Sequence, residues 1–172
     1  MKNIIACILP CFVLAFSANA EVSTKISDVH LCCQSCVKGV EKAVANVKDV
    51  TATVDKDAGT VTLAGPDKAA VQKAANALVA AGYFGKSSND EIKLATDTSA
   101  KGKKVQTLKL EGVHLCCPKC VTAVDKALKS VPGVQEHTAK KNAESFDVTG
   151  DFNDAEVLKA LQDRGLSGRV AK

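Results

Sequence analysis

The sequence predicts an α+β protein that contains two copies of one unit, each with the element order β-α-β-β-α-β and one antiparallel sheet covered by two helices. Two observations lead to this prediction. The phrase Val-His-Leu-Cys-Cys-x-x-Cys-Val stands at residues 29–37 and again at residues 113–121. After each phrase, the hydrophobic residues change from helical to strand spacing in the same order. We therefore expect a duplication, with the copies near residues 22–85 and 105–170.

The first half of each copy is expected to be a strand followed by a helix. Residues 25–31 and 107–111 are predicted to form the opening strands. Each cysteine phrase then leads into apolar residues at helical spacing. These residues are Val37, Val40, Val44 and Val47 in the first copy, and Val121, Val124, Leu128 and Val131 in the second.

The second half is expected to be a hairpin, a helix and a last strand. In the first copy, alternating residues at 50–54 and 61–63 flank a turn at 57–59. The helix that follows carries Val71, Ala74, Ala75, Leu78 and Val79 and is expected to end at Gly82, as its counterpart ends at Gly165. Residues 91–94 are expected to complete the last strand of the first copy.

The N-terminus has the pattern of a secretory signal. Lys2 precedes an apolar run over residues 4–16, and an Ala-x-Ala sequence ends at Ala20. We expect residues 1–20 to be a signal peptide that is cleaved near Ala20. The expected location is periplasmic or secreted, with no membrane association after cleavage.

The rest of the chain is expected to form two domains, at residues 21–95 and 105–172, joined by a linker at 96–104 that is rich in small polar residues. The net charge of +4 is low, and basic residues are scattered among acidic ones instead of gathering in one patch, so nucleic acid is not an expected partner. No acid pairs with a base, and no glycine loop suits a phosphate, so the chain is not expected to be an enzyme.

Both copies resemble heavy-metal-associated domains, the small ferredoxin-like modules of copper chaperones, copper-pump N-termini and periplasmic mercury-binding proteins. That family carries a Gly-Met-x-Cys-x-x-Cys loop between the first strand and the first helix. The resemblance covers nearly all of the chain after the signal apart from the linker, and it implies a ferredoxin-like fold. It places the metal-ligand positions at Cys33, Cys36, Cys117 and Cys120.

Both copies depart from the family pattern in the same way. Leucine replaces the methionine, histidine replaces the glycine, and a third cysteine occupies the variable position. The histidines are His30 and His114, and the additional cysteines are Cys32 and Cys116. These four side chains are further candidate metal ligands.

The residue types indicate a soft metal ion. Thiols at the start of a helix have a lowered pKa, and the thiolate is the form that binds metal. Two thiolates suit a linear Cu(I) or Hg(II) site, whereas three thiolates and an imidazole make a Cys₃His set for Zn(II). The expected cargo is therefore Cu(I) or Zn(II), with Hg(II) as a further candidate, and up to one ion in each domain.

We therefore expect an exported protein that sequesters a thiophilic metal ion or transfers it to a metal-transporting or metal-accepting protein. The alternative is a periplasmic thiol–disulfide protein that uses Cys33 with Cys36 and Cys117 with Cys120, since Cys-Pro-Lys-Cys at 117–120 resembles the motif of periplasmic oxidoreductases. The first copy lacks that proline, and a redox role does not explain the histidines or the third cysteines.

Overall fold

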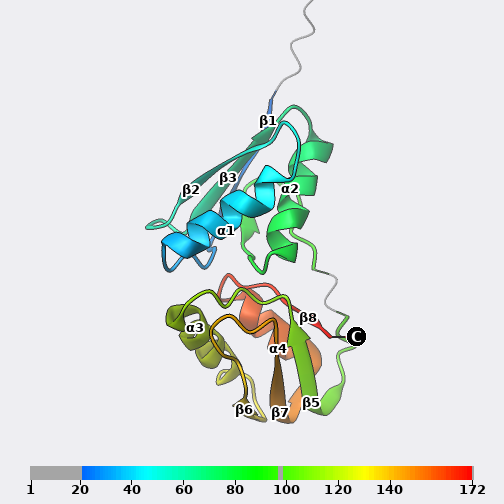
Figure 1. The fold of residues 1–172 in the computed structure, drawn as a ribbon. Coiled ribbons are helices and arrows are strands. Elements are labelled where there is room, and N and C mark those ends of the chain that lie inside the picture. The colour runs from blue at the N-terminus through cyan, green and yellow to red at the C-terminus, as the bar shows by residue number, and fades with distance from the viewer. Residues whose placement is uncertain (1–20, 97–98, 172) are drawn as a thin grey trace, which may run out of the picture.

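The computed structural model describes residues 21–96 and 99–171, and the expected signal peptide lies outside these residues. Two units follow one another along the chain, each with the order β-α-β-β-α-β, and Figure 1 shows them stacked one above the other. The first unit consists of β1 (Val22–Ser27), α1 (Gln34–Ala45), β2 (Thr51–Asp55), β3 (Thr60–Gly65), α2 (Lys68–Ala80) and β4 (Lys86–Ser87). The second consists of β5 (Lys104–Glu111), α3 (Pro118–Leu128), β6 (Val134–His137), β7 (Ser145–Asn153), α4 (Asp154–Gln162) and β8 (Arg169–Val170).

Each unit has its own four-stranded sheet. The strand orders are β2-β3-β1-β4 and β6-β7-β5-β8, and all neighbouring strands run antiparallel. The predicted α+β class, with antiparallel sheets and helices, is confirmed. In the described part of the chain the longest helix has 13 residues, too few to cross a bilayer.

The helices that follow the cysteine phrases are amphipathic. In α1 the buried residues Cys36, Val37, Val40 and Val44 lie on one face, and α3 buries its own face in the same way. The predicted stripe is longer than the helix, because Val47 and Val131 lie past the helix ends in turns that still bury them. Burial of these short apolar stripes stabilises the junction that presents the cysteines.

The opening strand is shorter than predicted. β1 ends at Ser27, and Asp28 then adopts a positive φ of 61°. Gly112, its counterpart in the second unit, has a φ of 74°. Residues 28–31 therefore leave the sheet instead of extending it. This left-handed residue turns each chain out of its strand and into the cysteine loop, and glycine and aspartate are residues that tolerate such a φ.

The last strand of the first unit was predicted in the wrong place. It is β4 at Lys86–Ser87, which pairs with Ile26 and Ser27, whereas residues 91–94 form a turn and irregular backbone. The reason lies in Gln72 of α2, whose side chain bonds both the N–H and the C=O of Lys93 at 2.9 and 2.6 Å. With its backbone bonded to α2, the segment leaves the sheet while Ile92 remains fully buried.

The two units meet through a short symmetric backbone contact. Tyr83 and Leu166 form an isolated antiparallel bridge, Phe84 N–H donates to Gly165 O at 3.1 Å, and Ser167 N–H donates to Gly82 O at 2.9 Å. These residues correspond to one another in the repeat, so the contact has approximate two-fold symmetry. Gly82 and Gly165 were predicted only to end helices, and the structure adds this second role.

Candidate metal centre

The two cysteine loops, at residues 28–33 and 112–117, face each other where the units meet. His30 N–H donates to Gly165 O at 3.2 Å, which ties the first loop to the end of the second unit. All six described cysteines are unbridged thiols. We call them the sulfur cluster, and its members are Cys32, Cys33, Cys36, Cys116, Cys117 and Cys120.

Within each unit the thiols lie in contact as the sequence predicts. The Cys33 and Cys36 sulfurs are 3.8 Å apart, and so are those of Cys117 and Cys120. The third cysteine approaches the helical one at 3.6 Å in the first unit and 3.7 Å in the second. A disulfide needs sulfurs about 2.05 Å apart, so these are contacts between free thiols.

The thiols also touch across the two units, which the sequence did not predict. The Cys32 sulfur lies 3.3 Å from that of Cys117 and 3.6 Å from that of Cys120. In the symmetric pair of contacts, Cys116 lies 3.8 Å from Cys33 and 3.6 Å from Cys36. Each of these four contacts includes Cys32 or Cys116, the first cysteine of its loop.

Both predicted histidines reach the sulfur cluster. His114 forms a group with Cys36, Cys116 and Cys120 in which one ligand atom from each residue lies within 4.8 Å of the others. His30 forms a similar group with Cys32 and Cys120, and Cys32, Cys33 and Cys117 form a third. The structure thus brings all eight predicted side chains together, and each group draws on both units.

The two helices contribute to the electrostatics of the cluster. Cys33 and Cys117 are the N-cap residues of α1 and α3, with extended φ values of −161° and −151°, and neither side chain caps its helix. The first-turn N–H groups of both helices therefore face the region of the sulfurs, and the positive end of each helix dipole stabilises thiolates there.

Burial and neighbouring thiols shift the pKa values of several of these cysteines in different directions. A contact from the Cys120 thiol lowers the pKa of Cys36, and the same contact raises the pKa of Cys120. Burial raises the pKa of Cys32 and that of Cys116. Burial also opposes ionisation of Cys117, but the Cys120 N–H and the Cys32 thiol outweigh it and lower its pKa to about 7. The contact between Cys36 and Cys120 therefore favours one thiolate and one thiol in this buried pair.

Sequence reasoning did not identify Tyr83 as part of this centre. Its hydroxyl donates to Cys36 O at 2.9 Å and lies 3.1 Å from Nε2 of His114. Burial raises the pKa of Tyr83, so the hydroxyl keeps its proton. A Cβ on Gly39 would lie 2.2 Å from this hydroxyl, which explains the glycine in α1. A comparison of the two copies could have identified this pair of residues, because both positions differ between the copies. Tyr83 corresponds to Leu166, and Gly39 corresponds to Ala123.

The symmetry of the centre therefore breaks at the histidines. Leu166 offers no hydroxyl to His30, and Nε2 of His30 is buried without a hydrogen-bond partner in the described part of the chain. Burial also lowers the pKa of His30, which favours the neutral imidazole. A buried, neutral and unpartnered ring nitrogen beside thiols is suited to ligate a metal ion.

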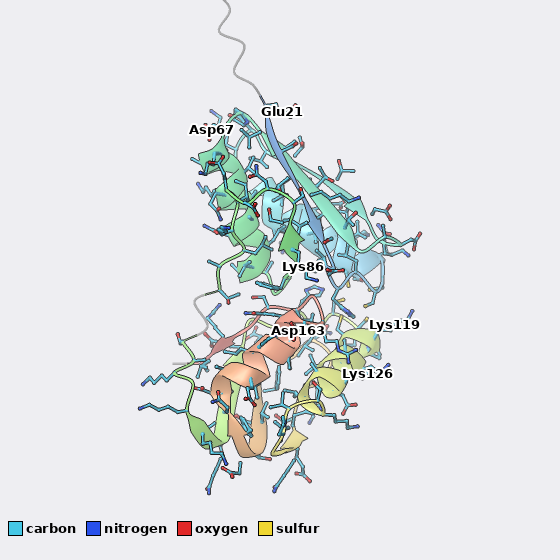
Figure 2. All side chains as sticks on the ribbon, turned by 180° about the vertical axis from the view of Figure 1, so that it is seen from behind. Glu21, Asp67, Lys86, Lys119, Lys126 and Asp163 are labelled. Carbon is cyan, nitrogen blue, oxygen red and sulfur yellow. The ribbon has the colours of Figure 1, made fainter. Side chains whose placement is uncertain are left out.

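A basic pocket of about 400 Å³ opens beside the cluster. Its lining includes His30 and Cys32 together with the basic residues Lys119, Lys126 and Arg164. Figure 2 shows Lys119 and Lys126 together on α3. All three cations are exposed, so their positive charge attracts an anion toward the pocket that Cys32 also lines.

No protein-family model matches the chain. Over 160 residues it is 30% identical to Copper-transporting ATPase 1 of Rhizobium meliloti (strain 1021), a stretch that covers 91% of this chain and 17% of the ATPase. Copper-transporting ATPase 2 of the same organism is 31% identical over 163 residues, with the same coverage of both chains. The N-terminal domain of PacS from Synechocystis PCC6803 is a solved structure with 26% identity and a TM-score of 0.35, and the match covers 40% of this chain and 100% of that domain. The chain is thus related in sequence to a small part of two copper-transporting ATPases.

Proposed function

We propose that this protein binds a soft metal ion, with Cu(I) as the preferred cargo, and that it sequesters the ion or passes it to another protein. The observation that carries the proposal is the convergence of six thiols and two imidazoles, with sulfur–sulfur distances of 3.3–3.8 Å. The groups contain sulfur and nitrogen ligands and no carboxylate, a set that favours Cu(I), Zn(II) or Hg(II) over Mg(II) or Ca(II).

Copper is preferred over zinc for two reasons. Most of the close contacts in the cluster join sulfur to sulfur, and thiolates shared in this way suit Cu(I). The two curated relatives are named as copper transporters. Zn(II) remains the competing cargo, because Cys36, His114, Cys116 and Cys120 also form a Cys₃His set.

Transfer requires that an incoming ligand can reach the metal. Cys36 and Cys120 are fully buried, whereas Cys32, Cys33, Cys116 and Cys117 are partly exposed. Exposed thiolates can be replaced one at a time by the thiols of a metal-accepting protein, while the buried pair retains the ion. We propose such a metal-transporting or metal-accepting protein as the partner, and an exported location for both.

A thiol–disulfide function is the second candidate. The observation that favours it is the 3.3 Å contact between Cys32 and Cys117, from which an inter-unit disulfide requires only a small movement. It does not explain why both histidines approach the sulfurs. No catalytic function is included in the proposal.

Native mass spectrometry of the reduced, exported protein during titration with Cu(I) and Zn(II) tests the proposal. We expect tight uptake of Cu(I) and weakened uptake in the Cys36→Ser variant, since Cys36 is buried at the centre. Ser35→Ala is a matched control, because Ser35 is the exposed neighbour of Cys36 and should leave uptake unchanged. A reduced protein that takes up neither ion but is oxidised rapidly by glutathione disulfide, with release of two reduced glutathione molecules, would establish the redox function instead.

A further inference from the structure

We infer that the sulfur cluster is a single site for several Cu(I) ions, shared between the two units, and not two separate sites with one ion each. The inference rests on the proposed function, since it presupposes that the thiols bind Cu(I). It concerns the number of ions, their arrangement and the role of the third cysteine in each loop.

The sulfurs form four triangles of a size that suits trigonal metal ions. A metal that lies about 2.3 Å from three sulfurs in one plane holds them about 4 Å apart. The first triangle, Cys32–Cys117–Cys120, has sides of 3.3, 3.8 and 3.6 Å. Its symmetric counterpart, Cys116–Cys33–Cys36, has sides of 3.8, 3.8 and 3.6 Å.

Two more triangles share the buried pair of sulfurs. Cys36 and Cys120 lie within 4.8 Å of each other and form their common edge. Cys32 completes one triangle, at 3.6 Å from both, and Cys116 completes the other, at 3.6 and 3.7 Å. Four triangles give the cluster a capacity of up to four Cu(I) ions.

No ion in these triangles belongs to one unit. Each triangle takes two sulfurs from one unit and one from the other, so every bound ion joins the units. Adjacent triangles share an edge, so an ion in one shares thiolates with an ion in the next. The geometry therefore favours a cluster with bridging thiolates, in which the Cu(I) ions lie close together.

The third cysteine of each loop makes this sharing possible. The four inter-unit sulfur contacts listed above all include Cys32 or Cys116. Without these two residues, each unit keeps its Cys-x-x-Cys pair, the two pairs approach each other only through Cys36 and Cys120, and no triangle of sulfurs remains. Each of the four triangles thus includes the third cysteine of one loop, either Cys32 or Cys116.

The surroundings offset the charge of such a cluster. Six thiolates and four Cu(I) ions carry a net charge of −2. The N-termini of α1 and α3 face the sulfurs, and Lys119, Lys126 and Arg164 line the adjoining pocket. His30, whose Nε2 is buried and unpartnered, lies with Cys32 and Cys120 and provides a neutral terminal ligand.

Two double variants that each remove two thiols provide the test. In Cys32→Ser/Cys116→Ser only the Cys-x-x-Cys pairs remain, so we expect two ions that bind independently. In Cys33→Ser/Cys117→Ser the two central triangles remain, so we expect two ions that share Cys36 and Cys120. Native mass spectrometry counts the ions, and X-ray absorption detects a short Cu–Cu distance. Circular dichroism confirms that each variant is folded.

For the wild-type protein we expect about four ions taken up together, and a Cu–Cu signal. That signal should persist in Cys33→Ser/Cys117→Ser and disappear in Cys32→Ser/Cys116→Ser. Two ions in the wild type with no Cu–Cu signal would overturn the shared cluster and leave the proposed function intact. A wild-type protein that binds no Cu(I) would overturn both.

Discussion

The hydroxyl of Tyr83, in the first unit, lies 3.1 Å from Nε2 of His114, in the second. The same hydroxyl donates to the backbone oxygen of Cys36, so one buried side chain connects the start of α1 with the cysteine loop of the second unit. The equivalent position in the second unit is Leu166, which leaves His30 without a corresponding partner. The two halves of the centre are therefore similar in their sulfurs and different in their histidines.

Replacement of Tyr83 by phenylalanine should weaken the contact between the units. The change removes the two buried contacts of the hydroxyl, to the Cys36 oxygen and the His114 nitrogen, at a combined cost of about 1–3 kcal/mol. We expect the free energy of unfolding of the metal-free protein in urea to fall by this amount. An unchanged unfolding curve would show that the hydroxyl contributes nothing at this interface.

The two histidines should respond differently to substitution by alanine. His30→Ala removes a ring nitrogen that bonds no described group, so we expect weaker Cu(I) binding and little loss of stability. His114→Ala also removes the Tyr83 contact, so it should lower stability as well. Competition with a chromophoric Cu(I) chelator measures affinity, and urea unfolding measures stability. Equal effects of the two variants on stability would contradict the asymmetry.

Gly165→Ala should separate the units. A Cβ at this position would lie 2.3 Å from the backbone oxygen of Asp28 and 2.5 Å from the nitrogen of His30. We expect fewer Cu(I) ions per chain in native mass spectrometry. Gly102→Ala is the matched control, since Gly102 has a similar φ of 65° but no atom within 4 Å of the added carbon. Equal ion counts in both variants would show that the cluster does not depend on this close approach.

Asp154 should make stability depend on pH below 4. Its carboxylate is only 5% exposed and accepts the N–H groups of Lys101 and Lys103, both at 2.9 Å. Burial alone would raise its pKa, but these backbone bonds hold the pKa below the usual range. The ionised carboxylate therefore contributes fully to the free energy of unfolding above the pKa of an unfolded aspartate, about 3.9. This contribution is lost as the pH falls through the lower pKa of the folded state.

The variant Asp154→Asn should lower the free energy of unfolding at pH 7 by about 1–3 kcal/mol. The difference from the wild type should shrink below pH 4. Asp151→Asn serves as the control, because Asp151 forms only an exposed ion pair with Lys104, worth under about 1 kcal/mol. A difference that grows on acidification would refute the assignment.

The basic pocket should speed metal delivery from anionic carriers. Lys126→Ala and Arg164→Ala should each slow Cu(I) uptake from a glutathione complex in stopped-flow experiments, and added salt should reduce the difference. Lys129→Ala is the control, since Lys129 lies just past the end of α3 and pairs with Asp125 instead of lining the pocket. Rates that are the same in all variants at low salt would exclude steering by this pocket.

The sequence was sufficient to predict the features that depend on local residue patterns. The α+β class followed from periodicity, and the resemblance indicated which cysteines to consider. The sulfur contacts between the units could not be predicted, because they depend on how the loops leave their strands at Asp28 and Gly112 and on the bridge between Tyr83 and Leu166. The strand expected at residues 91–94 was wrong for a similar reason, since Gln72, a distant side chain, bonds that backbone.

The two units with the same element order place both interacting surfaces in one chain. Two separate copies of the unit would have to collide before their loops could meet, so assembly of the centre would slow as the protein became dilute. With both copies in one chain, the encounter is intramolecular and its rate does not depend on protein concentration. Such a protein can bring its six thiols together however few copies of it are present.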